Sequence, residues 1–185
     1  MSNEYLAEIK MPLVFKDIME SKCLNKILYG GRLGGKSNNT GIISILNMLE
    51  HPDTDVVVAR VSYGSLSDSS FAELTHAIDS FDNDTISDMF EFKKSPLRIE
   101  RKDGRGTCYF IGYGGSNTSR TKSIRPKHPI KVVVLEETQE LKDKRNLEEA
   151  LASLRRHYAP DAQVFILGNP PPAEAHWFNV FIEQR

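Results

Sequence analysis

The sequence predicts an α/β fold in which a mainly parallel sheet is flanked by helices. A glycine-rich turn at residues 30–37 stands between a short apolar strand and a helix with apolar spacing. Apolar runs that suit buried parallel strands follow at residues 55–60, 130–135 and 163–167. Helical patterns separate these runs, and such alternation is typical of parallel sheets covered on both faces.

The first four elements lead into and out of the glycine-rich turn. Residues 12–22 are expected to form a short helix, and residues 26–29 form the first strand. Apolar residues at helical spacing predict a helix over residues 38–50, which ends before Pro52. The continuous apolar run at 55–60 then predicts a strand buried on both faces.

The middle of the chain is expected to leave this regular alternation. Serines and Asp68 can cap a helix over residues 67–81. Residues 97–101 and 107–111 flank an Asp-Gly turn and predict a β-hairpin, interpreted as an insertion near 97–111. Residues 112–127 are rich in Gly, Ser, Asn and basic side chains and predict a loop.

The last third returns to strand and helix. Residues 130–135 form the most apolar run, and residues 145–158 carry helical spacing. Another buried strand is expected at 163–167, after which three consecutive prolines, 170–172, interrupt regular structure. A final helix is expected over residues 176–183.

Composition sets limits on the class of protein. The 185 residues suit one domain, and 39% hydrophobic with 26% charged residues is ordinary for a globular chain. A net charge of −1 argues against nucleic-acid binding over the whole surface, but it permits a local basic patch. No apolar run approaches the roughly 20 residues that cross a bilayer, so no membrane partner is expected. Cys23 and Cys108 suit a reducing cytoplasm, because they form neither a disulfide framework nor a zinc motif.

The glycine-rich turn carries the strongest chemical signal. Residues 30–37 fit G-x-x-x-x-G-K-S/T, the phosphate-binding P-loop, and their position between a strand and a helix supports the match. Backbone N–H groups, the helix dipole and the Lys36 ammonium would attract phosphate, and the Ser37 hydroxyl would bind Mg²⁺. We therefore expect ATP and Mg²⁺ as cofactors, with these nucleotide-binding residues: Gly30, Gly31, Arg32, Gly34, Gly35, Lys36, Ser37 and Asn38.

Two acids follow the most apolar strand, as in a Walker B motif. Glu136 is the expected magnesium ligand, directly or through water, although Asp is usual at this position. Glu137 is placed to polarise the attacking water. The alternative interpretation is a pair of solvated acids after a strand.

The next strand ends in Gly168 and Asn169, which fit the γ-phosphate sensor of P-loop ATPases with an additional central strand, the RecA-like type. Asn169 is alternatively a turn former before proline. Arg32, inside the P-loop, is a candidate for stabilising γ-phosphoryl charge or a solvent-facing residue.

The chain resembles the N-terminal ATPase region of the large terminase subunit of tailed bacteriophages. The matching segments keep the family's order over nearly all of residues 26–182. They are Gly30-Gly31-Arg32, Lys122-Ser123-Ile124, Leu135-Glu136-Glu137-Thr138-Gln139-Glu140-Leu141, Leu154-Arg155-Arg156, Gly168-Asn169-Pro170-Pro171 and His176-Trp177-Phe178.

This resemblance implies a motor that hydrolyses ATP to drive double-stranded DNA into a procapsid. It implies Glu137 as the catalytic base, Arg32 and Lys36 as catalytic cations, and Gly168 with Asn169 as the segment coupling hydrolysis to movement. The implied partners are the portal protein, the procapsid, the small terminase subunit and further copies in a ring on the portal, in the host cytoplasm during phage assembly.

The family also carries a C-terminal nuclease that has no counterpart in this sequence. We interpret residues 1–185 as a single ATPase domain and expect no nuclease activity from it. The adenine site is weakly marked, with Phe15 and Tyr29 as weak candidates that suit the core better. Basic residues around the predicted hairpin could contact DNA phosphates or simply be solvated: Lys93, Lys94, Arg101, Lys102 and Arg105.

Two other functions fit the same motifs. One is another nucleic-acid-dependent P-loop ATPase, such as a helicase or a recombinase-like motor. The other is a nucleotide-binding assembly module that has no turnover in isolation.

Overall fold

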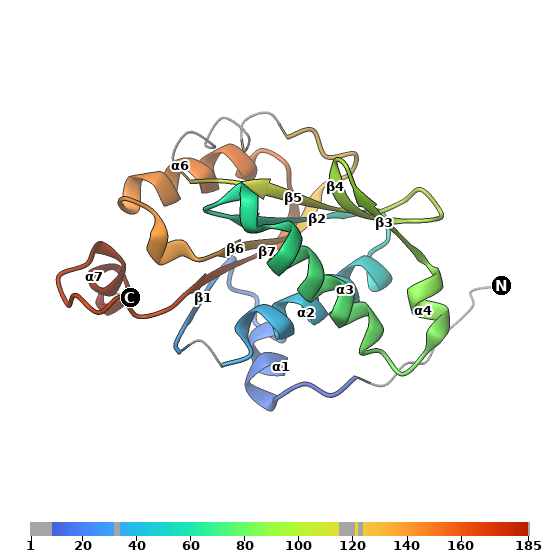
Figure 1. Ribbon diagram of the computed structural model, residues 1–185, viewed down its shortest axis with the longest axis horizontal. Helices are drawn as coiled ribbons and strands as arrows, with labels where there is room; N and C mark the ends of the chain where they lie inside the picture. The colour runs from blue at the N-terminus through green and yellow to red at the C-terminus, as the bar shows by residue number, and fades with distance from the viewer. Residues whose placement is uncertain (1–8, 32–33, 115–120, 122–123, 185) are drawn as a thin grey trace.

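The computed structural model describes residues 9–31, 34–114, 121 and 124–184. The strands found there form one sheet with seven members, in the spatial order β1-β7-β6-β2-β5-β4-β3 (Figure 1). Their bounds are β1 Asn25–Tyr29, β2 Asp55–Arg60, β3 Phe90–Lys94, β4 Leu97–Arg101, β5 Thr107–Gly112, β6 Ile130–Glu136 and β7 Tyr158–Gly168.

Five neighbouring strands, from β1 to β5 in spatial order, run parallel. Strand β7 lies between β1, which leads into the P-loop, and β6, which leads into the two acids. This order confirms the predicted fold with an additional central strand. Because parallel strands end at a common edge, it also places the ends of β1, β7, β6 and β2 together.

The predicted hairpin is present and extends the main sheet. Strand β4 pairs antiparallel with β5, as expected, but β5 also pairs parallel with β2. The sequence prediction missed β3, which pairs antiparallel with β4 and forms the sheet edge. Of the β3 side chains only Phe90 is buried, so the strand carries little apolar signal.

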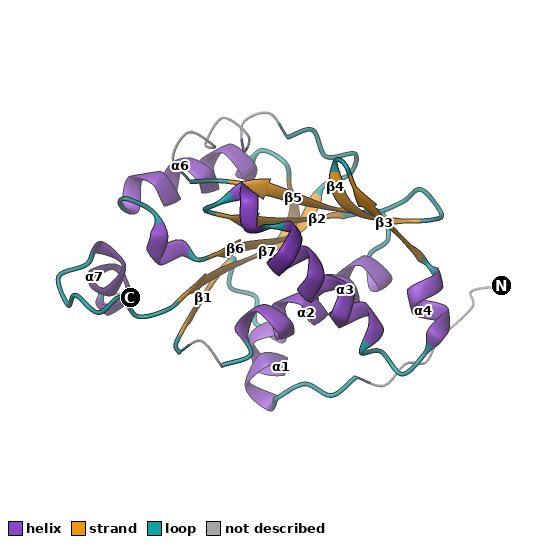
Figure 2. Cartoon of the chain, viewed as in Figure 1, coloured by secondary structure: helices purple, strands orange, loops and turns teal. Residues whose placement is uncertain are grey.

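Helices cover both faces of the sheet (Figure 2). Side chains from helices α1 to α4 pack with Val56 and Val58 in one core. Side chains from α6 and α7 pack with Val57 on the opposite face. Successive strand residues point to opposite faces, which explains the buried three-valine run. The bounds are α1 Leu13–Glu20, α2 Lys36–Glu50, α3 Ala72–Asp79 and α4 Asp84–Asp88 on the first face, and α6 Lys144–Arg155 and α7 Trp177–Glu183 on the second.

Several boundaries differ from the expected ones. Helix α2 begins at Lys36, inside the P-loop motif itself. The expected helix 67–81 is divided into a π-helical turn, η2 (Ser67–Phe71), and α3. Strand β7 begins at Tyr158, earlier than expected, because Tyr158 pairs with Ile130 before an irregularity in the register. Much of the predicted loop 112–127 lies outside the described residues.

The buried residues include Phe15, a candidate adenine contact that instead belongs to the core. Tyr29 is 39% exposed and donates its hydroxyl to Oδ1 of Asn179 at 2.7 Å. Within the ranges given above, no helix is long and apolar enough to cross a membrane.

Candidate nucleotide-hydrolysis site

The P-loop connects β1 to α2. Gly35 adopts the left-handed conformation, φ 66°, which glycine reaches without strain, and α2 begins at the next residue. The N–H of Gly34 donates to the carbonyl of Gly31 at 3.2 Å. The unpaired N–H groups of the first turn of this 15-residue helix therefore face the loop and suit a phosphate. Arg32 lies outside the described residues.

The ammonium of Lys36 lies under this loop. Its Nζ donates to the carbonyls of Gly30 and Gly31, at 2.9 and 2.7 Å, and to Oδ1 of Asn169 at 3.1 Å. Burial lowers the pKa of Lys36, and the nearby Glu137 carboxylate acts in the opposite direction. A charge held by carbonyl and amide dipoles, without a direct ion pair to Glu137 in the described residues, is well suited to interact with phosphate oxygens.

Glu136 ends β6 as a buried carboxylate that is 4% exposed. The Ser70 hydroxyl donates to its Oε2, and Nη1 of Arg60 lies 3.6 Å from the same oxygen. Burial raises the pKa of Glu136, while the Ser70 hydrogen bond and the Arg60 charge partly offset that effect. The sequence did not indicate Ser70 or Arg60 as part of the site.

Glu137 has a positive φ of 53°, the only such non-glycine residue in the described part of the chain. This conformation is uncommon for a side chain as large as glutamate and turns the backbone sharply after β6. The hydroxyl of Tyr113 supports the turn, because it lies 3.0 Å from both the Glu136 carbonyl and the Thr138 hydroxyl. The strained backbone directs the second acid away from the strand.

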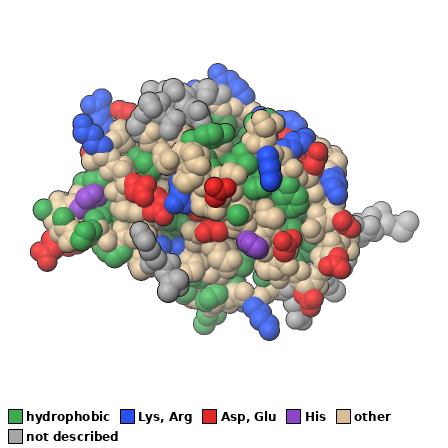
Figure 3. All heavy atoms as spheres, in the orientation of Figure 1, with side chains coloured by type: hydrophobic (Ala, Val, Ile, Leu, Met, Phe, Trp, Pro, Cys, Tyr) green, Lys and Arg blue, Asp and Glu red, His purple; other side chains and the backbone are tan. Residues whose placement is uncertain are grey.

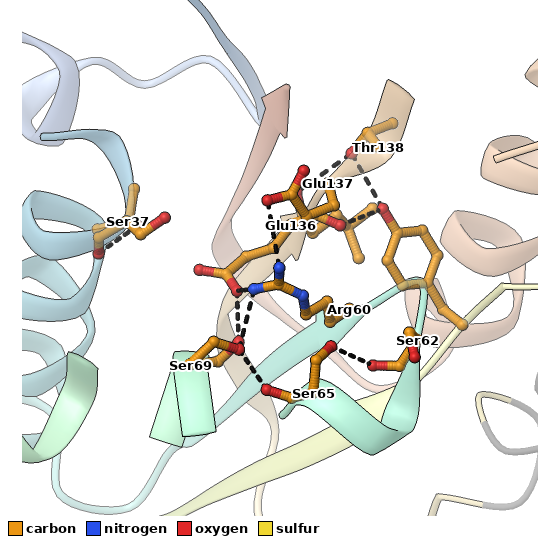
Figure 4. Close-up of polar contacts among 12 residues, drawn as sticks. Ser37, Arg60, Ser62, Ser65, Ser69, Glu136, Glu137 and Thr138 are labelled. Atoms are coloured by element: carbon orange, nitrogen blue, oxygen red, sulfur yellow. Dashed lines mark hydrogen bonds and ion pairs between the residues drawn. The ribbon is translucent and has the colours of Figure 1, made fainter. Parts of the chain in front are cut away.

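Two side chains hold the Glu137 carboxylate. Nη2 of Arg60 lies 3.3 Å from Oε1, and Nε2 of Gln139 donates to Oε2 at 2.5 Å. Figure 4 shows the Arg60 guanidinium between the two glutamates and Ser69, to which Nη1 donates at 2.9 Å. Each carboxylate oxygen can accept a second hydrogen bond, so a water molecule can still bind Glu137.

The residue that follows β7 contacts both the P-loop lysine and the segment after β6. Asn169 accepts from Lys36, and its own N–H donates to Oε1 of Gln139 at 3.1 Å. A Cβ on Gly168 would lie 2.2 Å from Cε1 of Phe178, so only glycine allows α7 to pack this closely.

These elements enclose a cavity of about 460 Å³ at the carboxyl edge of the sheet. Figure 3 shows acidic side chains, with a basic one between them, gathered near the middle of the face toward the viewer. The cavity is lined by residues predicted for the site from the sequence and by four that were missed: Gly35, Lys36, Ser37, Asn38, Glu136, Glu137, Gly168 and Asn169, and then Arg60, Ser69, Glu73 and Leu167.

The missed residues come from segments without a recognisable motif. Arg60 is the last residue of a strand that the sequence did predict, and Arg60 pairs with Glu136 in the parallel register. The sequence signal that could have identified Arg60 was its position at the end of a parallel strand, at the same sheet edge as Glu136. Glu73 lies on α3, and burial followed by the Glu136 charge raises its pKa. Its carboxylate adds to the negative charge of the cavity.

The donor set fits Mg²⁺. Ser37 lies across from the two glutamates (Figure 4), and hydroxyl and carboxylate oxygens are the ligands that Mg²⁺ prefers. No group of three or more His, Cys, Asp or Glu side chains in the described ranges could hold a metal by itself. At nucleotide sites Mg²⁺ is usually bound by one or two protein ligands together with phosphate oxygens and water.

The predicted DNA-contact residues do not form one free basic surface. Arg101 is 8% exposed, its guanidinium bonded to Asp103 and to the carbonyl of Met48. This burial overturns Arg101 as a surface contact, because Arg101 shares the inward face of β4. Arg105 pairs with Asp53.

Three lysines of that set remain on the surface. Nζ of Lys93 lies 2.8 Å from Oε2 of Glu100 and 3.3 Å from Oε2 of Glu91, so acids partly neutralise it. Lys94 and Lys102 are exposed.

A family model described as phage terminase large subunit matches residues 22–184. The chain belongs to this family. The large terminase subunit of Bacillus phage SPP1 is 29% identical to the chain over 170 residues, which are 90% of this chain and 39% of that protein. The chain thus spans well under half of this curated relative.

Solved structures of the family and of a related motor share the fold. The large terminase of bacteriophage HK97 matches 95% of this chain, using 36% of its own, with a TM-score of 0.69 at 12% identity. The ATPase domain of the Thermus phage P74-26 large terminase matches 89%, using 66% of its own, with a TM-score of 0.63 at 13% identity. A chain of the bacteriophage Phi-29 viral genome packaging motor assembly matches 95%, using 51% of its own, with a TM-score of 0.58 at 16% identity.

Proposed function

We propose that this terminase chain hydrolyses ATP with Mg²⁺ to drive double-stranded DNA into a procapsid. The observation that carries the proposal is one cavity in which the Lys36 ammonium and the α2 N-terminus meet the Glu137 carboxylate. Membership of the terminase family and the shared fold with an ATPase domain and a genome packaging motor support the choice of reaction and of DNA as cargo.

Each group has a distinct role in this proposal. Lys36 and the N–H groups of residues 34–37 bind the β- and γ-phosphates. Ser37 and Glu136 would hold Mg²⁺, which when bound neutralises charge on the phosphate oxygens. Glu137 accepts a proton from the attacking water. Arg32 contributes positive charge from the loop, and Gly168 with Asn169 relays the state of the γ-phosphate.

The assembly partners extend the same proposal. The motor would act as a ring on the portal of the procapsid, receive DNA from the small terminase subunit, and work in the host cytoplasm. Lys94 and Lys102 remain as candidate contacts to DNA phosphates, because both are exposed.

Phosphate release and DNA packaging test the proposal together. Glu137→Gln should lower ATP turnover by about 10²- to 10⁴-fold, the usual contribution of a general base, while ATP still binds. Glu148→Gln, on the exposed face of α6, is the control and should leave turnover unchanged. Nuclease-protected DNA in procapsids should depend on ATP and on Glu137. Wild-type protein that binds ATP but releases no phosphate with procapsid and DNA present would refute the function.

A further inference from the structure

One glutamine side chain connects two parts of the site that are far apart in the chain. Nε2 of Gln139 donates to Oε2 of Glu137 at 2.5 Å, and Oε1 of Gln139 accepts from the N–H of Asn169 at 3.1 Å. The amide therefore joins the acid after β6 to the residue after β7. No family motif quoted above assigns a role to this side chain.

Chemistry fixes the orientation of this amide. A backbone N–H can only donate, so it faces the amide oxygen, while an ionised carboxylate can only accept, so it faces the amide nitrogen. Turning the amide over would oppose two donors at one end and two acceptors at the other. Gln139 therefore holds the Glu137 carboxylate in one position relative to the end of β7.

The connection continues to the phosphate-binding lysine. Oδ1 of Asn169 accepts from Nζ of Lys36 at 3.1 Å, and the other two contacts of that ammonium are P-loop carbonyls. An ammonium has three N–H donors, so a phosphate that binds Lys36 competes with these contacts. A change at Lys36 thus reaches Asn169 first and then, through Gln139, the base.

We infer that Gln139 is a positioning residue that aligns Glu137 for proton transfer and makes this alignment depend on phosphate at Lys36. The inference rests on the proposed function for the role of Glu137. Gly168 supports it, because a Cβ there would lie only 3.1 Å from Oε1 of Gln139. The missing side chain leaves room for the amide against the end of β7.

Gln139→Met tests the inference, since it keeps the length of the side chain and removes both hydrogen bonds. We expect kcat for ATP to fall roughly ten- to hundred-fold, the order of effect that a misplaced catalytic group produces. KM should stay within about twofold, because Gln139 does not line the phosphate-binding surface. The control is Gln163→Met, which alters a half-buried glutamine bonded to the Met19 carbonyl away from the site and should leave both constants unchanged.

A double-mutant cycle separates positioning from a merely structural role. In a Glu137→Gln background, Gln139→Met should have no further effect on the residual rate, because the group that it aligns is gone. An equal loss in both backgrounds, or full kcat in Gln139→Met, would overturn the inference while leaving Glu137 as the base.

A binding measurement does not depend on turnover. Addition of Mg-ATPγS should shift the side-chain amide resonances of Gln139 together with the P-loop backbone amides, and Asn169→Ala should reduce the Gln139 shift. P-loop shifts without any Gln139 shift would contradict the inference alone. If no P-loop amide moved, the proposed function itself would fail.

Discussion

Nη2 of Arg60 lies 3.3 Å from Oε1 of Glu137, while Nη1 of the same guanidinium lies 3.6 Å from Oε2 of Glu136. One cation therefore serves two adjacent carboxylates, one of which is buried. Without it, the like charges of the acids would face each other in a partly dry cavity, where their repulsion is strong. We therefore expect Arg60 to affect both the stability of the fold and the turnover proposed for Glu137.

Arg60→Met should lower both stability and turnover. We expect the free energy of unfolding in urea to fall by about 1–3 kcal/mol, because a buried carboxylate loses a charged partner. kcat should fall about tenfold or more, because Glu137 loses one of the two side chains that position its carboxylate. Arg145→Met provides the control, since it removes only an exposed pair with Glu149 and should change stability by less than about 0.5 kcal/mol. A wild-type kcat in Arg60→Met would show that Arg60 does not position Glu137 for catalysis.

Removal of two buried tyrosine hydroxyls should have different effects on the free energy of unfolding. The Tyr113 hydroxyl bonds to the Glu136 carbonyl and to Thr138, whereas the Tyr158 hydroxyl is buried without a hydrogen-bond partner among the described residues. Tyr113→Phe should lower the free energy of unfolding by about 1–2 kcal/mol and reduce kcat, because the strained Glu137 turn loses its support. Tyr158→Phe should be neutral or stabilising. Chemical denaturation of both variants checks the contrast.

The Tyr158 hydroxyl also predicts a pH dependence. Burial raises the pKa of Tyr158 to about 12, above the value near 10 of an exposed tyrosine. Because the unfolded tyrosine ionises first, this group leaves stability unaffected below about pH 10, and the free energy of unfolding falls as the pH rises from about 10 toward 12. Tyr158→Phe should therefore lose less stability than the wild type over that range. Parallel losses in the two proteins would show that this hydroxyl does not titrate there.

Two exposed lysines and one buried arginine give a test of the DNA surface. If Lys94 and Lys102 contact phosphates, the double change to Gln should weaken DNA binding and reduce the slope of log affinity against log salt by about 2. Arg101→Met should leave DNA affinity unchanged and lower stability, because Arg101 bonds to the Met48 carbonyl inside the protein. An unchanged salt slope in the lysine variant would place the DNA contacts elsewhere.

The sequence predicted those parts of the site that are contiguous in the chain. The P-loop, the acids after β6 and Asn169 each come directly after a predicted strand. Strand prediction alone therefore places Lys36, Glu137 and Asn169 at one edge of the sheet. Arg60 required the spatial strand order, which places β2 beside β6. Gln139 required side-chain contacts with the end of β7, which no pattern in the sequence reveals.

Arg101 was misjudged although a local signal existed. Alternation along β4 puts Leu97, Ile99 and Arg101 on the same buried face, so period two already opposed a surface role. A cationic side chain favours the surface, but the position of Arg101 in this alternation favours the interior. An aliphatic stem and a paired guanidinium allow arginine to occupy such a position.

Gly168→Ala should disturb both the packing of α7 and the site. The new Cβ would lie 2.2 Å from Cε1 and 2.4 Å from Cζ of Phe178, so the ring or the strand end must move. We expect a loss of about 1–3 kcal/mol in the free energy of unfolding, as for other overpacked sites. Asn169 is the next residue, and its displacement should also lower kcat.

Relief of the same clash provides the decisive comparison for Gly168. In a Phe178→Leu background, Gly168→Ala should cost clearly less than it does alone, because the smaller side chain leaves space for the added methyl group. Gly64→Ala is the matched control, since a Cβ there would meet nothing within 4 Å and should change stability little. Additive losses in the double variant would mean that the glycine serves the backbone of β7 rather than the approach of the Phe178 ring.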